Sequence, residues 1–149
     1  MDQIQELVEL ESLRRLKGLY FYLMDTKQWD GWLALFMPDA TLHWDLGVWG
    51  EGREVTTVGF VGKDEIEKHV VREILGPAIC VHHGFTPVLD VHSDTEATGI
   101  WTMEDLVIAR DQSLLHGYGH YHETYHKVDG SWRFASIHLK RVRIDSSRV

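Results

Sequence analysis

The chain has 149 residues, 44% of them hydrophobic, so it can bury one sizeable core and is not an intrinsically disordered sequence. Its formal net charge of −8 argues against nucleic acid as the main partner, and no apolar run approaches the roughly 18 residues that cross a membrane. A single cysteine, Cys80, excludes an intramolecular disulfide framework, and the acidic N-terminal segment lacks a signal-peptide pattern, so we expect one cytoplasmic domain over residues 1–149.

The first third of the chain predicts two helices and a strand. Apolar residues recur at helical spacing from Ile4 to Leu23, which predicts a helix over residues 4–25. The segment "TKQWDGW" breaks this helix and begins a short second one, which "MPDA" ends. "TLHWDL" then alternates as a strand does, whereas glycines recur over residues 46–62 and predict an irregular, lid-like loop.

The remaining sequence predicts a third helix followed by a sheet. "GKDEIEKHVVREIL" has acidic residues in its first turn and Gly76-Pro77 after its last, as a helix does. After Pro77 the apolar period changes to two, and Asp129-Gly130 is a strong hairpin signal. The predicted strands lie at residues 79–91, 96–110, 114–128 and 131–144. Helices first and an antiparallel sheet afterwards indicate an α+β fold.

Alternation along these strands assigns side chains to faces. In the strand from residue 79, Cys80 and His82 share one face, and His83 lies on the other. In the next strand, Trp101, Met103 and Asp105 share a face. Both faces carry apolar residues, so alternation alone does not say which one lines a pocket.

Four histidines in "HGYGHYHETYH" raise the question of a metal site. His116, His120, His122 and His126 all point to one side of a strand, and His120 and His122 could chelate at i, i+2. Against this, the four span roughly 33 Å at about 3.3 Å per residue. The run also has no "HExxH" and no cysteine ligand. We therefore favour a polar or subunit-facing strand side, and expect no metal; a site at His120 and His122 is the weaker alternative.

General acid–base chemistry is better supported, since no "GxSxG" and no P-loop is present. Asp25 ends the first helix, where the helix dipole disfavours an anion, so it needs a specific partner. Asp105 lies in an apolar strand face, Tyr20 lies about a turn before Asp25, and Arg141 shares a face with apolar residues. Each alone is explained as a buried, satisfied polar residue, but several in so small a chain indicate a site.

At this point a resemblance is visible over nearly the whole chain. The segments "LKGLYFYLMDTKQWDGWLALFMPDATLHW", "HHGFTP", "ATGIWTMED" and "YHETYHKVDGSWRFASIHLKRVRI" resemble the SnoaL-like, nuclear-transport-factor-two-like superfamily. The resemblance implies a cone-shaped, curved antiparallel sheet with about three N-terminal helices. The closing Tyr-x-x-x-Tyr-x-x-x-Asp-Gly-x-Trp motif is typical of the fold more than of an activity.

The branch that looks most similar contains scytalone dehydratase, hexachlorocyclohexane dehydrochlorinase and bile-acid 7α-dehydratase. By this resemblance, Asp25 orients His82, and His82 abstracts a proton from a substrate carbon. The resemblance to the bile-acid enzyme adds Tyr20, Asp105 in "MED" and Arg141 to the catalytic set.

Two points of this transfer stay open. Arg143 has the same parity as Arg141 and is the alternative pocket arginine. The second catalytic histidine of scytalone dehydratase is not matched, because Val107 falls at about that position.

These residues lead to an expected function. We expect a cofactor-independent lyase, dehydratase-like, or an isomerase, acting on a small hydrophobic, ring-containing molecule of steroid or polyketide type. The alternative is a non-catalytic hydrophobic-ligand-binding or assembly module of the same fold. The resemblance also implies a homo-oligomer, for which we favour a trimer over a dimer. The expected pocket wall consists of Trp32, Trp44, Trp49, Phe60, Trp101 and Met103.

Overall fold

The structure is a computed structural model that describes residues 2–48 and 54–149. It begins with helix α1 (Gln3–Asp25), whose first turn is capped by the Asp2 side chain accepting a 2.8 Å hydrogen bond from the backbone N–H of Gln5. Lys27, at a φ of 61°, turns the chain into the short helix α2 (Trp29–Leu33). Both predicted helices are therefore confirmed, but the second ends at Leu33, and "MPDA", expected to end it, lies in strand β1 (Phe36–Val48).

The third predicted helix is confirmed in extent and corrected in its hydrogen bonding. One α-helical turn, α3 (Lys63–Glu65), continues as the π-helix η1 (Ile66–Leu75). The backbone N–H of Gly76 bonds to the carbonyl of Val71, five residues earlier, at 2.8 Å. Apolar spacing in a short segment does not distinguish the wider π turn from the α turn.

Six strands form one sheet in the order β2-β1-β6-β5-β4-β3. All neighbours are antiparallel except β1 and β6, which are parallel. The four strands predicted after Pro77 are confirmed, although the last runs four residues beyond its predicted end. The strands are β1 (Phe36–Val48), β2 (Thr57–Val61), β3 (Ile79–Val91), β4 (Glu96–Ile108), β5 (Ser113–Val128) and β6 (Ser131–Arg148).

Strand β2 corrects the loop expected over residues 46–62. It pairs with β1 from Thr41↔Val61 to Asp45↔Thr57, and its Phe60 is buried. The glycines in this segment obscure the strand pattern in the sequence. They lower the strand propensity but still allow the backbone hydrogen bonds between strands to form. Residues 49–53 of the expected loop lie outside the described residues.

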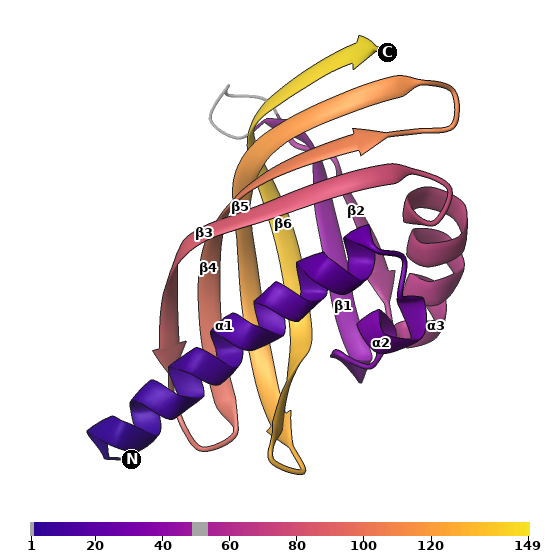
Figure 1. The fold of residues 1–149 in the computed structure, drawn as a ribbon. Helices are drawn as coiled ribbons and strands as arrows, with labels where there is room; N and C mark the ends of the chain where they lie inside the picture. The colour runs from indigo at the N-terminus through magenta and orange to yellow at the C-terminus, as the bar shows by residue number, and fades with distance from the viewer. Residues whose placement is uncertain (1, 49–53) are drawn as a thin grey trace.

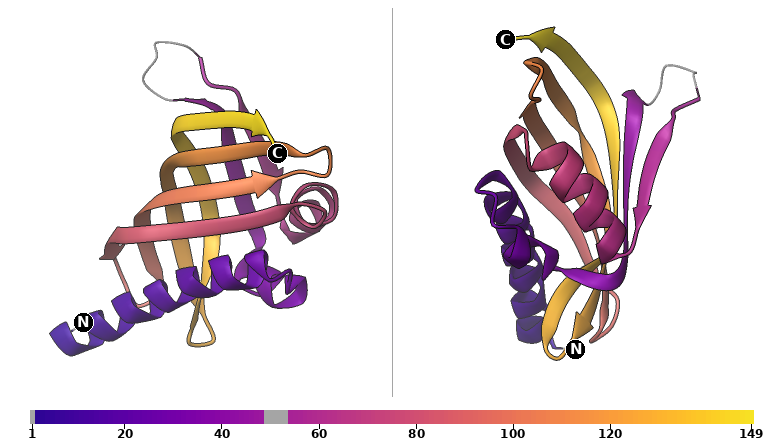
Figure 2. Two further views of the ribbon diagram at one scale, coloured as in Figure 1. Left: turned by 45° about the horizontal axis from the view of Figure 1, so that its top comes forward. Right: turned by 90° about the vertical axis from the view of Figure 1, so that its right-hand side faces the viewer.

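The sheet is strongly curved, and the helices all lie on one side of it (Figure 1). Figure 2 shows α1 and the α3–η1 helix facing the inner side of the sheet, with the C-terminal end of β6 projecting beyond them. Between helices and sheet lies one apolar core, with Leu13, Phe36, Leu42 and Ile137 fully buried. Within the described part of the chain, no helix is both long and apolar enough to cross a membrane.

The inner face of the sheet is the one that carries His82. Cys80 and His82 are buried on β3, whereas Val81 and Phe85 are exposed on its other side. On β4, Trp101, Met103 and Asp105 are buried. The four even-numbered histidines of β5 lie on the outer side, since the buried residues of that strand, from Gly117 to Tyr125, are all odd-numbered. Parity therefore grouped the side chains correctly, and burial now decides which group faces inward.

Candidate functional site

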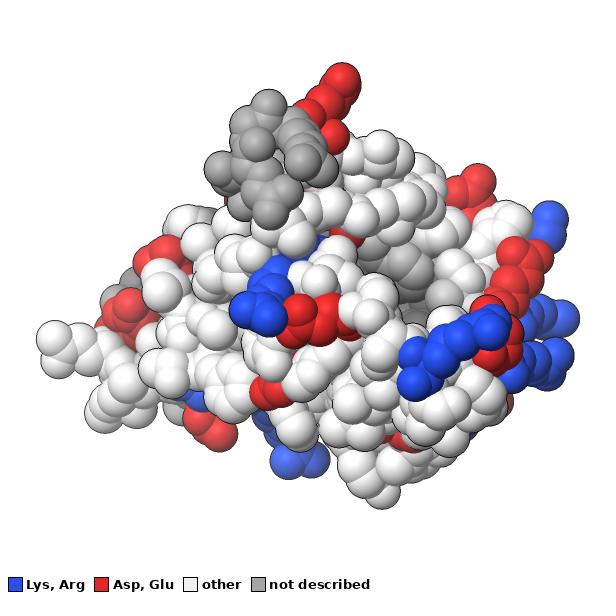
Figure 3. Space-filling model, turned by 90° about the horizontal axis from the view of Figure 1, so that it is seen from above, with Lys and Arg blue, Asp and Glu red and all other residues white. Residues whose placement is uncertain are grey.

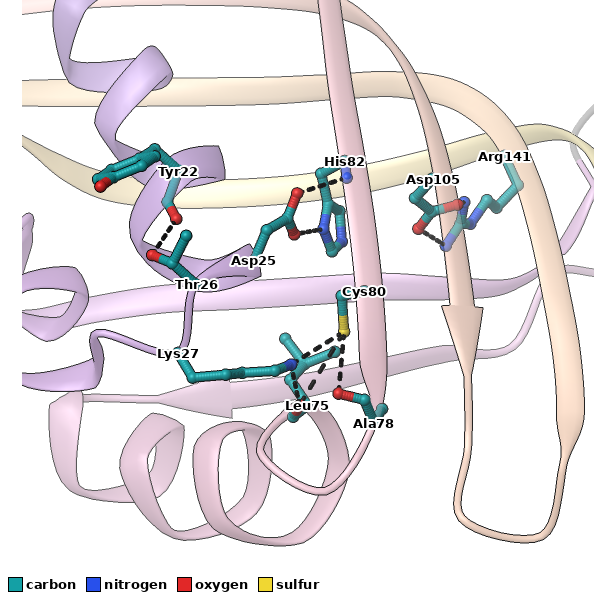
Figure 4. A network of polar contacts seen from close by, with 10 residues as sticks. All are labelled: Tyr22, Asp25, Thr26, Lys27, Leu75, Ala78, Cys80, His82, Asp105 and Arg141. Atoms are coloured by element: carbon teal, nitrogen blue, oxygen red, sulfur yellow. Dashed lines mark hydrogen bonds and ion pairs between the residues drawn. The ribbon is translucent and has the colours of Figure 1, made fainter.

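Asp25 and His82 lie side by side at the point where α1 ends against β3 (Figure 4). The carboxylate Oδ1 of Asp25 lies 2.7 Å from Nδ1 of His82, and Oδ2 accepts a 2.8 Å hydrogen bond from the backbone N–H of the same residue. The His82 side chain is only 5% exposed and that of Asp25 is 24% exposed. One carboxylate thus holds both the backbone and the ring of His82 in place.

This contact determines which nitrogen of His82 is free. A neutral imidazole that donates Nδ1–H to a carboxylate carries its lone pair on Nε2. Among the described residues no partner for Nε2 is found, and the ring is stacked on Phe21 with 12° between the planes. His82 also lines a cavity between the helices and the sheet, which is described next. Its Nε2 is therefore available as a base to a molecule inside that cavity.

The cavity has a volume of about 510 Å³ and lies between helices and sheet. Seen from above, the protein surface is mostly uncharged and is hollowed near its centre (Figure 3). Polar side chains are concentrated at the level of His82, and apolar and serine side chains line the cavity farther along β5 and β6. The lining residues are Tyr20, Met24, Trp44, Asp45, Leu46, Val58, Ile74, Leu75, His82, Asp105, Val107, Ala109, Ser113, Leu114, Leu115, Tyr121, Leu139, Arg141, Ile144, Ser146 and Ser147.

Asp105 lies directly across the sheet ladder from His82, as its register partner on β4. Its two carboxylate oxygens accept hydrogen bonds of 2.6 and 2.8 Å from Nη1 and Nη2 of Arg141. Both residues are buried. Strand β5 lies between them, and Arg141 crosses it at Gly117, where an added Cβ would lie 2.0 Å from Nη1. The glycine therefore makes this ion pair possible.

The structure places Arg141 on the cavity and Arg143 outside it. Arg143 is exposed and pairs with Asp145 at 3.0 Å. The two arginines share sequence parity but not a face, because Tyr118 pairs with Arg143 while Gly119 pairs with Arg141. The extra residue, Val142, forms a β-bulge that reverses the alternation.

Tyr20 lies on α1 one turn before Asp25 and lines the same cavity. Burial raises the pKa of its phenol well above the ordinary value, and the negative charges of Glu123, Asp105 and Asp25 add to this effect. The hydroxyl is therefore a proton donor throughout the usual pH range. It belongs to an aromatic cluster with Trp32, whose ring centroid is 5.5 Å away.

The segment that follows Asp25 is tied to the start of β3. Lys27 Nζ donates a 2.7 Å hydrogen bond to the carbonyl of Leu75 at the end of η1 and lies 3.5 Å from the sulfur of Cys80. These contacts hold the end of α1, the end of η1 and the start of β3 together beside the Asp25–His82 pair (Figure 4). Burial raises the pKa of the Cys80 thiol, opposed by Lys27, so the thiol is held in its neutral, weakly nucleophilic form.

A family comparison agrees with this architecture. The sequence model for the SnoaL-like domain matches residues 5–138. The chain belongs to the SnoaL-like family. The predicted superfamily is thereby confirmed, and with it the curved, unclosed, cone-shaped sheet.

Solved structures with the same fold carry different names. A candidate scytalone dehydratase from Novosphingobium aromaticivorans is 24% identical, over 99% of this chain and 93% of that one, with a TM-score of 0.83. Hexachlorocyclohexane dehydrochlorinase LinA-type3 from Novosphingobium barchaimii is 16% identical, over 98% and 94%, with a TM-score of 0.77. The β subunit of a candidate aromatic-ring-hydroxylating dioxygenase from N. aromaticivorans is 11% identical, over 94% and 93%, with a TM-score of 0.73. At these identities the likeness establishes the fold alone.

The predicted wall of the cavity needs correction in this SnoaL-like protein. Trp44 lines the cavity, but Trp32, Phe60, Trp101 and Met103 are not among its lining residues and are buried in the core. Trp101, for example, donates a 3.0 Å hydrogen bond to the Tyr125 hydroxyl. Trp49 lies outside the described residues.

The residues that sequence reasoning missed lie mainly at the far end of the cavity. They include Leu114, Leu115 and Ile144, at the ends of predicted strands, and Ser146, which lies beyond the predicted end of the last strand. Asp45, a buried carboxylate bonded to Thr57 and His138, was also missed. It lies three residues after Leu42, so strict alternation would have placed it on the opposite face, and β1 has irregular pairing with β6.

A second buried polar network lies beneath α1 and was not predicted. Lys17 forms a fully buried ion pair with Glu123, and its Nζ lies 3.6 Å from the centre of the Tyr121 ring. Burial lowers the pKa of Lys17 to about 8, although Glu123 acts in the opposite direction. Helical spacing from Leu13 and Tyr20 was the available signal, because it places Lys17 on the apolar stripe.

The histidines on the outer face make separate pairs. His116 Nε2 lies 2.6 Å from Glu104, and His138 Nε2 lies 2.7 Å from Asp45. Burial, together with Lys140 and His120, lowers the pKa of His122. In the part of the chain that the structure describes, no group of three potential metal ligands occurs, and His120 and His122 are not brought together with a third.

Proposed function

We propose that this SnoaL-like protein is a cofactor-independent lyase, in which His82 removes a proton from a carbon of a small hydrophobic, ring-containing substrate. The observation that carries the proposal is the free Nε2 of His82, which lines the cavity while Nδ1 is held by Asp25 at 2.7 Å. A carboxylate in this position fixes the tautomer and stabilises the imidazolium that forms. Elimination of water is the favoured outcome.

The proposed step balances without any added reagent. Nε2 of His82 takes the proton, the C–H electron pair forms the new double bond, and the leaving hydroxyl departs from the neighbouring carbon with its bonding pair. A proton returned from the imidazolium converts that hydroxyl into water. Tyr20, kept protonated by its burial, donates a hydrogen bond to the departing oxygen or to an enolate oxygen. In an isomerisation, the imidazolium would instead return the proton to another carbon.

Two similar structures support an elimination rather than another reaction class. One bears the name of a dehydratase and the other that of a dehydrochlorinase, and both names describe loss of a small group next to a carbon–hydrogen bond. The lining of the cavity supports a hydrophobic substrate, since apolar side chains outnumber the charged ones. The dioxygenase β subunit of the same fold supports the alternative, a non-catalytic binding or assembly module.

The test begins with a screen of hydroxylated ring ketones for binding by thermal shift and for formation of a conjugated product by ultraviolet absorbance. A ligand at 100 times its Kd should stabilise the fold by about 2.7 kcal/mol. His82→Ala and Asp25→Asn should each lower kcat by about 10² to 10⁴-fold. His83→Ala, on the exposed face of the same strand, is the matched control and should keep full activity.

The possible outcomes separate the two functions. Full activity of His82→Ala would overturn the mechanism. Binding of several compounds with no turnover of any of them would favour the binding module.

We also propose self-association through the outer face of the sheet, as a trimer. That face exposes Val81, Phe85 and Ile100, and no described helix covers it. Light scattering coupled to size exclusion should give a mass of three chains. Phe85→Lys, on the edge strand β3 of this face, should shift the mass towards one chain, and a monomeric mass for the unaltered protein would contradict the proposal.

A further inference from the structure

We propose that Asp105 acts as a charge filter: by occupying Arg141 it makes the cavity select uncharged ligands and reject carboxylates. This inference rests on the proposed function, because it concerns the substrate class of the same site. It assigns to Asp105 a role in specificity, apart from any part in the reaction.

The geometry of the pair is the first argument. Arg141 is the one cation among the described residues that line the cavity, and a guanidinium in an apolar cavity is a strong site for a carboxylate. Here Nη1 and Nη2, the two nitrogens that would grip such a ligand, both donate to Asp105 at 2.6 and 2.8 Å. Both of these donor nitrogens are therefore already bonded to a carboxylate of the protein itself.

The packing around the pair is the second argument, because it leaves the guanidinium little freedom to turn away. A Cβ added to Gly117 would lie 2.0 Å from Nη1 of Arg141 and 2.5 Å from Oδ1 of Asp105, so both groups rest on the backbone of β5. Met103 Sδ lies 3.9 Å from Nη1. A ligand carboxylate would have to displace Asp105 from Arg141 and leave the Asp105 carboxylate buried without a partner. That displacement carries a large free-energy penalty.

The surrounding charges are the third argument. With Arg141 neutralised by Asp105, the remaining ionisable side chains among the described lining residues are Asp45, His82, Tyr20 and Tyr121. Burial raises the pKa of both tyrosines, so they stay uncharged, Asp45 is buried, and His82 is bonded to the carboxylate of Asp25. The field inside is therefore negative or neutral and opposes an anion. The far end of the cavity offers the uncharged Ser113, Ser146 and Ser147. A substrate with an anionic group would need to keep that group outside the cavity.

The experiment compares two probes that differ only in charge, 2-naphthoate and methyl 2-naphthoate, by isothermal titration calorimetry. The unaltered protein should bind the ester at least about ten-fold more tightly than the carboxylate. Asp105→Asn frees the guanidinium and should strengthen binding of 2-naphthoate by about ten-fold or more, while ester affinity changes by less than about three-fold. Addition of Arg141→Met should remove the gain.

Two controls make the result specific. Asp145→Asn frees Arg143, an exposed arginine of the same strand, and should leave the ratio of the two affinities unchanged. If Asp105→Asn folds poorly, Asp105→Ser, which leaves room for water beside the guanidinium, is tested instead by thermal shift. Stabilisation by 2-naphthoate and not by the ester is then expected.

Equal affinity of the unaltered protein for both probes would overturn the filter, as would an unchanged ratio in the Asp105 variants. These readouts measure binding and not turnover. The filter and the proposed lyase activity can therefore fail separately: loss of selectivity leaves the His82 result intact, and absence of turnover leaves the affinity ratios intact.

Discussion

The inner face of the sheet carries buried charges in two regions that differ in what surrounds them. In the first region, beneath the N-terminal half of α1, Lys17 pairs with Glu123 and Lys127 pairs with Glu9. We call this region the closed end. In the second, where α1 ends, Asp25 pairs with His82 and Asp105 pairs with Arg141. We call this region the open end. Each region holds two carboxylates, each with a basic partner.

The difference lies in what is left unpaired. At the closed end, Glu123 accepts from Lys17 and Tyr125, and Glu9 accepts from Lys127, Trp132 and Gln5. Aromatic rings pack around the Lys17 ammonium group. At the open end, His82 keeps one nitrogen without a partner among the described residues, and a cavity lies against it. A buried charge is thus no sign of a site by itself; an unused lone pair beside an open volume is.

The comparison predicts that the closed end controls stability. Lys17→Met leaves Glu123 buried without its cation and should lower the free energy of unfolding by about 3–5 kcal/mol. Adding Glu123→Gln should recover most of this loss, because neutral side chains of similar volume need no counter-charge. Urea denaturation measures both, with Arg14→Met on the exposed side of α1 as control. A Lys17→Met protein as stable as the unaltered one would remove the distinction between the ends.

Glu9 should make the stability that the closed end contributes depend on pH in the acid range. Burial raises the pKa of Glu9, but hydrogen bonds from Lys127, Trp132 and Gln5 outweigh it, so the pKa lies below its ordinary value of 4.5. A carboxyl group whose pKa is lowered by folding stabilises the fold above its unfolded pKa, and this contribution disappears as pH falls through the folded pKa.

The corresponding variant is Glu9→Gln. It should lower the free energy of unfolding by about 1.5–3 kcal/mol at pH 7, since the hydrogen bonds of Glu9 are charge-assisted. The difference from the unaltered protein should shrink as pH falls below about 4.5. Denaturation series at several pH values measure it, and Glu11→Gln, exposed on the same helix, should show no such convergence. A constant difference down to pH 3 would show that the charge of Glu9 is not what matters.

Substitutions at the open end should change the stability of the fold much less than substitutions at the closed end. His82→Ala and Asp25→Asn should each change the free energy of unfolding by about 1 kcal/mol or less, because water in the cavity can solvate the groups left behind. The same urea titrations serve as the measurement. A loss as large as that of Lys17→Met would mean that the Asp25–His82 pair is a structural element like those of the closed end.

The sequence predicted the open end better than the closed end, and the reason is physical. Asp25 stood out because a carboxylate at a helix C-terminus needs a partner, and His82 followed from strand alternation and the family resemblance. The only signal at the closed end was the position of Lys17 on the apolar stripe of α1, and it was weak, since charges within a helix or strand usually face solvent. Their burial depends on packing between distant segments, which local periodicity does not contain.

The cavity wall was predicted least well. Large aromatic residues were expected to line it, yet most of them fill the core, where their area is best removed from water. Part of the true lining, such as Leu114 and Ser146, comes from strand ends whose length is set by pairing with neighbours rather than by their own composition. The choice between Arg141 and Arg143 depended on a bulge, and a bulge is invisible to a strict period of two.

The bulge at Val142 shifts the alternation of inward-facing and outward-facing residues in β6 by one position. From Ile137 to Arg141 the odd-numbered residues face inward; after the bulge, even-numbered residues such as Ile144 line the cavity. Opposite it, Gly119 has no room for a side chain, since a Cβ would lie 2.1 Å from the carbonyl oxygen of Lys140. An alignment with a relative that lacks the bulge must therefore be restarted at Val142, and a one-residue deletion there would exchange inward and outward chemistry for the whole C-terminal part of the strand.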